Sequence, residues 1–186
     1  MTCCVSNQYQ NPWDLPDNVI HQDLIESKKR IYNPCELACS QPVKEKESAE
    51  YGAYSFELNS FSIKYRVAKI TPTKVGQFVT LWKRMGDGPI LPYDVSDPVD
   101  FFVISTRKDN HFGQFIFPKS VLRDQAVLSV NKEGGKRAIR VYAPWEIVLN
   151  RQAQKTQQWQ TAYFLDMSKD KEIDFSRARM LYSQRT

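Results

Sequence analysis

The sequence of 186 residues contains no long apolar run. Its longest strictly aliphatic or aromatic stretch is residues 101–104, far short of the roughly 20 residues that a membrane-spanning helix requires. The first residues, Met-Thr-Cys-Cys-Val-Ser-Asn-Gln, show neither the basic start nor the apolar centre of a signal peptide, and no Asn-x-Ser/Thr glycosylation acceptor occurs. We therefore expect a cytoplasmic protein without membrane association.

Histidines are scarce, and familiar catalytic motifs are missing. His21 and His111 are the only two, and there is no Walker loop, Gly-x-Gly-x-x-Gly, Gly-x-Ser-x-Gly or His-Glu-x-x-His. A multi-histidine metal site is therefore excluded, and a serine or cysteine nucleophile would lack an obvious base.

The four cysteines, Cys3, Cys4, Cys35 and Cys39, all lie in the first quarter of the chain. This distribution does not suit a disulfide scaffold. A zinc site built from Cys35 and Cys39 with a terminal cysteine is one alternative. We favour the other, in which Cys35 and Cys39 are small apolar residues on one face of a short helix, and we expect no cofactor.

Composition and length indicate one folded domain. Hydrophobic residues at 41% and charged residues at 25% are ordinary for a globular chain, which excludes disorder, collagen and coiled coil. A chain of this length can bury its own core. We divide it into an irregular N-terminal arm, residues 1–16, and a single domain, residues 17–186.

The periodicity of apolar residues changes along the chain. Helical spacing predicts helices over 17–33, 35–40, 120–127 and 149–163, with the charged stretch 44–50 as helix or linker. Alternation predicts strands over 54–58, 61–67, 75–82, 101–105, 113–117 and 138–142. The first two strands should form a hairpin turning near Asn59 and Ser60, and a polar connection should join 101–105 to 113–117. The predicted fold is α+β, with a mixed, mainly antiparallel sheet flanked by helices.

Basic residues are concentrated in two segments. Residues 61–90 and 111–160 together carry 14 Lys/Arg and 4 Asp/Glu, a net charge of +10, whereas the rest of the chain has a net charge of −5. Such segregation predicts an electropositive face, and the alternative is an ordinary solvated surface.

The segment 69–84 alternates hydroxyls, lysines and an aromatic residue across a proline turn. Hydroxyl and ammonium groups bind phosphate oxygens, and an aromatic ring such as Trp82 can stack on a base. The alternative is a sheet edge with Trp82 in the core. The residues that we expect to hold phosphates here are Lys69, Thr71, Thr73 and Lys74, with Lys83 and Arg84 just beyond Trp82.

Five glutamines lie within residues 152–160. Glutamine can hydrogen-bond base edges or phosphates, although it is also a plain helix former on a solvated face. Upstream, strand alternation places Arg140 opposite the core-facing Ile139 and Val141. From these two regions we expect nucleic-acid contacts by Gln152, Gln154 and Lys155 and by Lys136, Arg137 and Arg140.

Four strings of the sequence resemble the MepB family, bacterial proteins named for a gene beside a multidrug efflux pump. They are Ile-Thr-Pro-Thr-Lys-Val-Gly-Gln-Phe-Val-Thr-Leu-Trp-Lys-Arg, Gly-Gln-Phe-Ile-Phe-Pro-Lys, Gly-Lys-Arg-Ala-Ile-Arg-Val-Tyr and Gln-Ala-Gln-Lys-Thr-Gln-Gln-Trp-Gln. The resemblance covers residues 50–165 in order. It implies a core similar to the PD-(D/E)XK nucleases, which is the restriction-endonuclease-like fold. It also implies an association with nucleic-acid binding, and the family's physiological role is poorly defined.

Nucleases of that fold place an Asp on one strand and Glu-x-Lys on the next, because the carboxylates hold a divalent metal and the lysine supports the attacking water. If the two central strands form a hairpin, Asp100 and Lys119 fall nearly opposite each other, about 5 Å apart. Phe117, however, stands where the glutamate should be. A single carboxylate binds magnesium poorly, so we expect a structural Asp100–Lys119 pair. We also expect Lys119 to hold a phosphate when nucleic acid is bound. The possible substitutes for the missing acid are Gln114, Asp97 and Glu50, none at the right spacing.

These observations lead to one main hypothesis and two alternatives. The main hypothesis is a cytoplasmic, non-catalytic protein that binds DNA or RNA, single-stranded or duplex, on a nuclease-like scaffold. The first alternative is a specialised magnesium-dependent nuclease using Asp100 and Lys119. The second is a protein-interaction module whose basic face meets an acidic partner.

Overall fold

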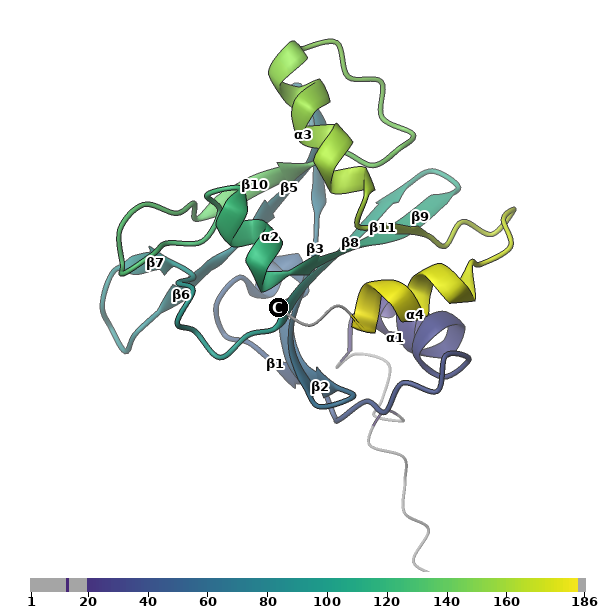
Figure 1. Ribbon diagram of the computed structural model, residues 1–186, viewed down its shortest axis with the longest axis horizontal. Coiled ribbons are helices and arrows are strands. Elements are labelled where there is room, and N and C mark those ends of the chain that lie inside the picture. Colours follow the sequence, from purple (N-terminus) through teal and green to yellow (C-terminus); the bar gives the residue numbers. More distant parts are fainter. Residues whose placement is uncertain (1–12, 14–19, 184–186) are drawn as a thin grey trace, which may run out of the picture.

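A six-stranded sheet built on two β-hairpins forms the centre of the structure, a computed structural model that describes residue 13 and residues 20–183 (Figure 1). In spatial order its strands are β1 (Val43–Lys44), β2 (Tyr54–Leu58), β3 (Phe61–Val67), β8 (Phe101–Lys108), β9 (His111–Pro118) and β11 (Phe164–Asp166). The hairpins are β2–β3 and β8–β9, and β3 lies parallel to β8, whereas the other neighbours are antiparallel. The predicted α+β fold with a mixed, mainly antiparallel sheet is confirmed.

Apolar side chains alternate between the two faces of this sheet and form a core on each. Along β8, Phe101 and Val103 lie in one core, whereas Phe102 and Ile104 lie in the other. Burial on both faces explains why the first half of this strand, residues 101–104, is a continuous apolar run. The first core includes residues of α1 (Gln22–Ser27), the π-helical turn Lys28–Tyr32 and α4 (Phe175–Ser183). The second includes residues of α2 (Lys119–Asp124) and of β5 (Lys74–Thr80) and β10 (Ala138–Val141), with α3 (Arg151–Thr161) packed against it.

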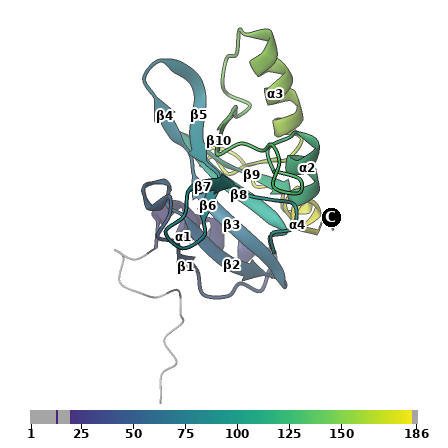
Figure 2. The ribbon, with the colours of Figure 1, turned by 90° about the vertical axis from the view of Figure 1, so that its left-hand side faces the viewer.

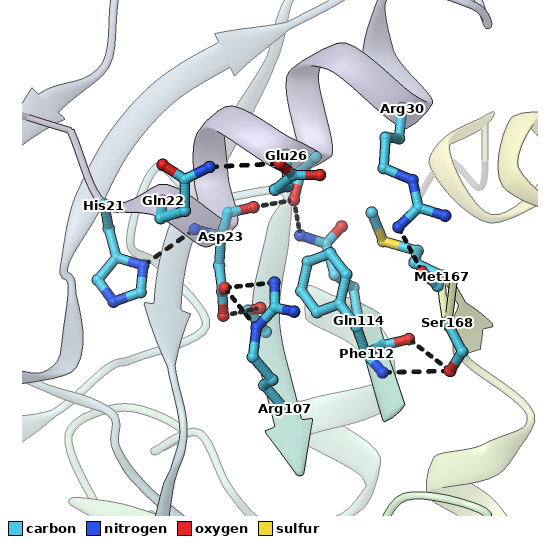
Figure 3. Close-up of polar contacts among 12 residues, drawn as sticks. His21, Gln22, Asp23, Glu26, Arg30, Arg107, Phe112, Gln114, Met167 and Ser168 are labelled. Carbon is cyan, nitrogen blue, oxygen red and sulfur yellow. Dashed lines mark hydrogen bonds and ion pairs between the residues drawn. The ribbon is translucent and has the colours of Figure 1, made fainter. Parts of the chain in front are cut away.

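Polar side chains fasten α1 to the first face of the sheet (Figure 3). The buried carboxylate of Asp23 accepts hydrogen bonds from Nε and Nη2 of Arg107, at 3.0 and 2.8 Å, and from Oγ of Ser105, at 2.9 Å. Beside it, Nε2 of Gln114 donates to Oγ of Ser27 at 2.5 Å. Because buried polar groups are stable only when they are paired, this cluster fixes the position of the helix. Gln114 therefore has a structural role here.

Trp13 falls within the predicted N-terminal arm, yet it is buried. Its ring meets Phe56 edge-on at 6.2 Å, and the ammonium group of Lys28 lies 4.8 Å from the ring centroid. The remainder of the predicted arm, with Cys3 and Cys4, lies outside the described residues, so its irregular character stays a prediction. Of the other cysteines, Cys35 is buried and Cys39 is partly buried.

The connection from β3 to β8 carries two further hairpins. β4 (Lys69–Thr71) and β5 turn at residues 72 and 73, and β6 (Trp82–Arg84) pairs with β7 (Ile90–Pro92). β10 then joins β5 from much later in the chain, giving a three-stranded sheet of order β10-β5-β4. Figure 2 shows the β4–β5 hairpin and α3 rising from the same end of the molecule, with β10 between them.

Several predicted elements are confirmed with shifted boundaries. The hairpin β2–β3 turns at Asn59 and Ser60 as predicted, both with positive φ, at 49° and 69°. The helix expected over 17–33 is observed from Gln22 to Tyr32 within the described residues. The charged stretch 44–50 leads into the short 3₁₀ turn Ala49–Tyr51.

Other predictions were wrong. Residues 35–40 form no helix. Residues 35 and 36 belong to a turn, and the end of the segment pairs with β2, where Ser40 N–H donates to Glu57 O at 3.0 Å. The expected polar connection 106–112 belongs largely to β8 and β9, which continue to a two-residue turn at Asp109 and Asn110. Neither β11 nor α4 was predicted. None of the helices in the described residues is long and apolar enough to cross a membrane.

Candidate nucleic-acid interface

A cavity of about 770 Å³ lies between the β4–β5 hairpin, β10 and α3, and we call it the α3 cavity. Lys74 and Val75 line it from the hairpin. Lys136, Ala138, Ile139, Arg140 and Tyr142 line it from β10 and its flanks. The loop 147–150 and α3 close the opposite side. The cavity thus brings the tip of the β4–β5 hairpin against residues that all lie within 125–160, about 50 or more positions later in the chain.

The α3 side of the cavity follows from helical spacing. Ala153, Thr156 and Gln160 stand three and four residues apart, so they share one face of the helix, and all three line the cavity. Asn150 begins the helix, since its Oδ1 accepts hydrogen bonds from the backbone N–H groups of Gln152 and Ala153.

Three of the glutamines bind the protein's own backbone. Gln160 is fully buried, donates from Nε2 to Arg140 O at 2.9 Å and accepts from Tyr142 N–H at 2.8 Å. Gln157 Nε2 donates to the carbonyls of Ala143 and Glu146, both at 2.9 Å. Gln154 Nε2 donates to Val148 O at 2.9 Å, and Gln154 itself does not line the cavity. These amides attach the loop that follows β10 to α3, and of the two glutamines expected to bind nucleic acid only Gln152 lines the cavity.

Arg140 joins β10 to the tip of the β4–β5 hairpin. Its Nη2 donates to Thr71 Oγ1 at 2.6 Å, and its Nη1 donates to the carbonyls of Lys74, Val75 and Gly76 at 3.0–3.4 Å. The predicted alternation along β10 is confirmed, because Arg140 is half-exposed while Ile139 and Val141 are buried. Arg140 thus contributes a positive charge to the cavity while its donors are occupied by the protein.

The α3 cavity is electropositive. Its lining contains Lys74, Lys136 and Arg140 and, among the residues that the structure describes, no carboxylate. Lys74 and Lys136 are exposed, and within residues 20–183 neither side chain has an ion-pair partner. A shallower hollow nearby is lined by Arg151, Gln152 and Lys155. We call Lys74, Lys136 and Arg140 the cavity cations.

Asp94 holds the loop that leads to Lys136. Its Oδ2 accepts from Ser129 Oγ at 2.7 Å and from Lys132 N–H at 2.9 Å, and its Oδ1 accepts from the N–H and Oγ of Ser96 at 3.0 and 2.7 Å. The hydrogen bonds from Ser96, followed by those from Lys132 and Ser129, lower the pKa of Asp94 well below its usual range. The carboxylate is therefore charged at neutral pH and ties residues 129 and 132 together ahead of β10.

The remaining residues predicted on the β4–β5 hairpin lie near the cavity without lining it. Lys69 extends over the ring of Tyr51, 4.7 Å from its centroid, and Thr71 is bound to Arg140. Thr73 is exposed at the hairpin tip. Arg137 follows Lys136 and is also exposed.

A second group of basic residues lies on β3 and β6 and is neutralised by carboxylates. Arg66 is fully buried, with Nη2 2.5 Å from Glu45 Oε2, and Lys64 Nζ lies 2.5 Å from Glu45 Oε1. Lys83 forms an ion pair with Asp97. We call Lys64, Arg66, Lys83 and Arg84, with their acidic partners Glu45, Asp97 and Glu47, the paired cluster.

Burial and this cluster alter a neighbouring tyrosine. Tyr93 OH accepts from Arg66 Nη2 at 3.2 Å, and burial raises the pKa of Tyr93 to about 12 although the arginine opposes the shift.

Trp82, expected to stack on a base, instead lies 5.7 Å from the guanidinium of Arg84 on the β6–β7 hairpin. Trp82, Lys83 and Arg84 are therefore not part of the α3 cavity.

Asp100 and Lys119 lie at the open end of the β8–β9 hairpin, as predicted, but their side chains do not pair. Lys119 N–H donates to Asp100 O at 2.9 Å, whereas its ammonium group donates to Asp97 O at 3.1 Å. The carboxylate of Asp100 accepts from Ser62 N–H at 2.8 Å. Gln114 is four residues from Pro118 along β9, roughly 13 Å away, and cannot replace the missing acid at this end.

A divalent metal does not fit this end of the hairpin. Phe117 is fully buried in the second core, so the position of the expected glutamate is closed to a ligand. In the described part of the chain, no three His, Cys, Asp or Glu side chains gather as a metal-binding group. We therefore derive no catalytic step through a metal.

Trp159 is one of the cavity residues that sequence reasoning missed as site residues; Gln125 and Tyr142 are others. Its ring lines the α3 cavity and lies 5.2 Å from the ring of Phe117. Its position was visible in the sequence, because Trp159 follows Thr156 by three residues and therefore shares its helical face. Among the tryptophans, the one on the Gln-rich helix, and not Trp82, faces the cavity.

Comparison with known proteins identifies relatives. A family model described as MepB-like matches residues 45–166. A crystal structure of MepB aligns with a TM-score of 0.69 and 32% sequence identity, over 82% of this chain and 100% of the chain in that structure. No curated protein matches significantly. The matched region contains the β4–β5 hairpin, β10 and α3, which are the elements around the cavity.

Proposed function

The protein belongs to the MepB-like family, and we propose that it is a cytoplasmic protein that binds nucleic acid without cleaving it, on a nuclease-like scaffold. The binding surface is the α3 cavity and its rim. One observation carries the proposal: the cavity cations surround a concave site in whose lining, among described residues, no carboxylate opposes them.

The positive charge of this surface favours the binding of a polyanion. Lysine and arginine at unpaired positions bind phosphates and release the counterions condensed on them, which drives association. Arg151 and Lys155 extend the same sign of charge along the exposed side of α3. Arg137 adds another exposed cation beside Lys136.

The nuclease alternative has less support. The Asp100 carboxylate is engaged by Ser62 N–H and the Lys119 ammonium by Asp97 O, so neither group is arranged for a water or a scissile phosphate. A protein partner is the second candidate, because Ile147 and Leu149 on the cavity rim are 81% and 87% exposed. Large apolar side chains at such exposure favour contact with another macromolecule.

The test is a salt series of binding isotherms on DNA and RNA oligonucleotides. Wild-type affinity should fall linearly on a log-log plot against salt, and the double variant Lys74→Ala/Lys136→Ala should reduce the slope by about two units. The matched control is Lys29→Ala/Lys44→Ala, which removes the same charge from exposed lysines elsewhere and should change the slope little.

Two results would contradict the proposal. Absent binding at about 50 mM salt, or binding indifferent to salt, would favour the protein-partner candidate. Cleavage of an oligonucleotide with magnesium or manganese that disappears in Asp100→Ala would favour the nuclease.

A further inference from the structure

Arg177 lies on α4, outside the lining of the α3 cavity, yet its guanidinium contacts the end of α3. We infer that Arg177 is a positioning residue for nucleic-acid binding, because it holds α3 in the orientation in which this helix forms one side of the cavity. The inference rests on the proposed function and names a residue that controls the same site without touching the ligand.

Three backbone carbonyls accept hydrogen bonds from the Arg177 side chain. Its Nε donates to Phe164 O at 2.8 Å, and its Nη2 donates to Ala162 O at 2.8 Å and to Thr161 O at 3.2 Å. Thr161 is the last residue of α3, Ala162 follows it as the C-cap, and Phe164 begins β11. One side chain of α4 thus binds the end of the helix and the start of the strand that follows it.

The end of α3 needs such a partner. The last carbonyls of an α-helix have no donor within the helix, and the aligned peptide dipoles attract a cation to this end. The last turn of α3 contains no basic residue of its own. Arg177 therefore supplies, from another helix, both the positive charge and the hydrogen-bond donors that this end lacks.

Arg177 also connects helices on opposite faces of the central sheet. The buried side chains of Ala178, Leu181 and Tyr182 fix α4 on the first core, whereas α3 packs against the second core. β11 is an edge strand of the sheet and lies between α3 and α4 (Figure 1). Because the guanidinium reaches the end of α3 at this edge, the position of α4 determines the direction in which α3 projects.

The direction of α3 sets the shape of the cavity on two sides. The helix lines one side itself. Its amides at Gln154, Gln157 and Gln160 hold backbone carbonyls within residues 140–148, so the loop that follows β10 moves with the helix. Loss of the Arg177 contacts therefore changes the shape of the binding surface, while the cavity cations keep their charges.

The experiment compares two arginines of the same helix. Arg177→Ala removes the three contacts, whereas Arg179→Ala removes an exposed arginine whose hydrogen bond, to Pro34 O at 3.5 Å, does not involve α3. In a salt series with an oligonucleotide, Arg177→Ala should bind at least about fivefold more weakly than wild type, with a salt slope changed by well under one unit because no phosphate contact is lost. Arg179→Ala should stay within about twofold of wild type.

A spectroscopic measurement separates positioning from a general loss of structure. Protein labelled with fluorotryptophan gives one fluorine NMR resonance for each of its four tryptophans, and Trp159→Phe identifies the resonance from α3. Arg177→Ala should shift this resonance, because the Trp159 ring lies 5.2 Å from the ring of Phe117 in the second core. The resonance of Trp82, on the β6–β7 hairpin, should stay in place.

The conservative variant Arg177→Lys keeps the charge at the end of α3 but cannot reach all three carbonyls. It should recover part of the affinity and part of the Trp159 shift. If Arg177→Ala does not fold, Arg177→Lys decides the question. Binding about threefold weaker than wild type with a shifted Trp159 resonance supports the positioning role, and affinity equal to that of Arg179→Ala overturns it.

The outcomes separate this inference from the proposed function. Equal binding by Arg177→Ala and Arg179→Ala, or a Trp159 resonance that does not move, would overturn the positioning role. The proposed function would survive if Lys74→Ala/Lys136→Ala still lowered the salt slope. A full unit of salt slope lost in Arg177→Ala would identify Arg177 as a phosphate contact and would also overturn positioning. Absence of any nucleic-acid binding by wild type would end both.

Discussion

The paired cluster and the cavity cations are both rich in lysine and arginine, yet they present opposite surfaces. In the paired cluster, Glu45 alone contacts two cations, Lys64 and Arg66, and the guanidinium of Arg66 is fully buried. Around the α3 cavity, Lys74 and Lys136 are exposed and, within residues 20–183, have no acidic partner. Lysine and arginine therefore stabilise the fold in the paired cluster, whereas around the α3 cavity they give the surface a positive electrostatic potential.

The comparison shows why charge segregation along a sequence does not by itself define a binding face. Residues 61–90 contribute basic side chains whose carboxylate partners, Glu45, Glu47 and Asp97, lie outside that segment. Pairing across strands cancels much of their charge. The remaining positive electrostatic field comes from lysines and arginines that have no carboxylate partner in the described residues. Three predictions test this difference between paired and unpaired cations.

The largest effect should be on stability in the paired cluster. Glu45→Ala leaves Arg66 buried with its charge unpaired, which typically costs about 3 to 5 kcal/mol. Denaturant unfolding should show this loss, while Glu50→Ala, an exposed carboxylate without an ion pair in the described residues, should stay within about 0.5 kcal/mol. Equal stability of the two variants would show that the ion pairs of the paired cluster do not stabilise the fold.

Arg140 should show an intermediate response, because it lines the cavity and also holds the hairpin tip. Arg140→Lys keeps the charge but cannot reach Thr71 and the three carbonyls together, so we expect a loss of about 1 to 2 kcal/mol in the free energy of unfolding. Nucleic-acid affinity should change less than about threefold. Arg137→Lys is the control, since that arginine is exposed and its side chain makes no hydrogen bond or ion pair in the described part of the protein. Unchanged stability of Arg140→Lys would show that the tip of the β4–β5 hairpin does not depend on the hydrogen bonds of the Arg140 guanidinium.

The smallest effect should be on binding at Lys83. Asp97 neutralises this lysine, so Lys83→Ala should change the salt slope of nucleic-acid binding by well under one unit. Lys74→Ala should change it by about one unit in the same assay. A full unit lost at Lys83 would place the paired cluster on the binding surface after all.

The sequence was sufficient for the longer strands, β2, β3, β5, β8, β9 and β10, although not for all of their ends, and much less so for the polar partners. The hairpin at Asn59 and Ser60 was predictable because alternation and turn residues agree there. The polar ends of β8 and β9 were mistaken for a connection, because Thr106 is buried although it is polar, and Arg107 and Lys108 are held by carboxylates that an apolar pattern does not reveal. Helix α4 was missed because its buried face is small, with Ala178, Leu181 and Tyr182 as its buried residues.

Part of the candidate site was open to sequence reasoning. Lys74, Lys136, Arg140 and Gln152 were named from the sequence, and the structure brings these four residues to one cavity. Composition does not reveal which partner within the fold each polar or charged side chain binds. The Gln154 amide donates a hydrogen bond to Val148 O, and Lys83 forms an ion pair with Asp97. Each side chain binds a nearby acceptor of the folded protein and is therefore less available to a ligand.

The long sequence separations around the α3 cavity have a consequence for the order of folding. Hairpins β2–β3 and β8–β9 close over a few residues, so they can form early and cheaply in entropy. The cavity needs β10 to reach β5 and Arg140 to reach Thr71, which is 69 positions away. During synthesis the chain can therefore assemble much of its central sheet before residues 138–160 exist, and the surface that would meet nucleic acid is completed only afterwards.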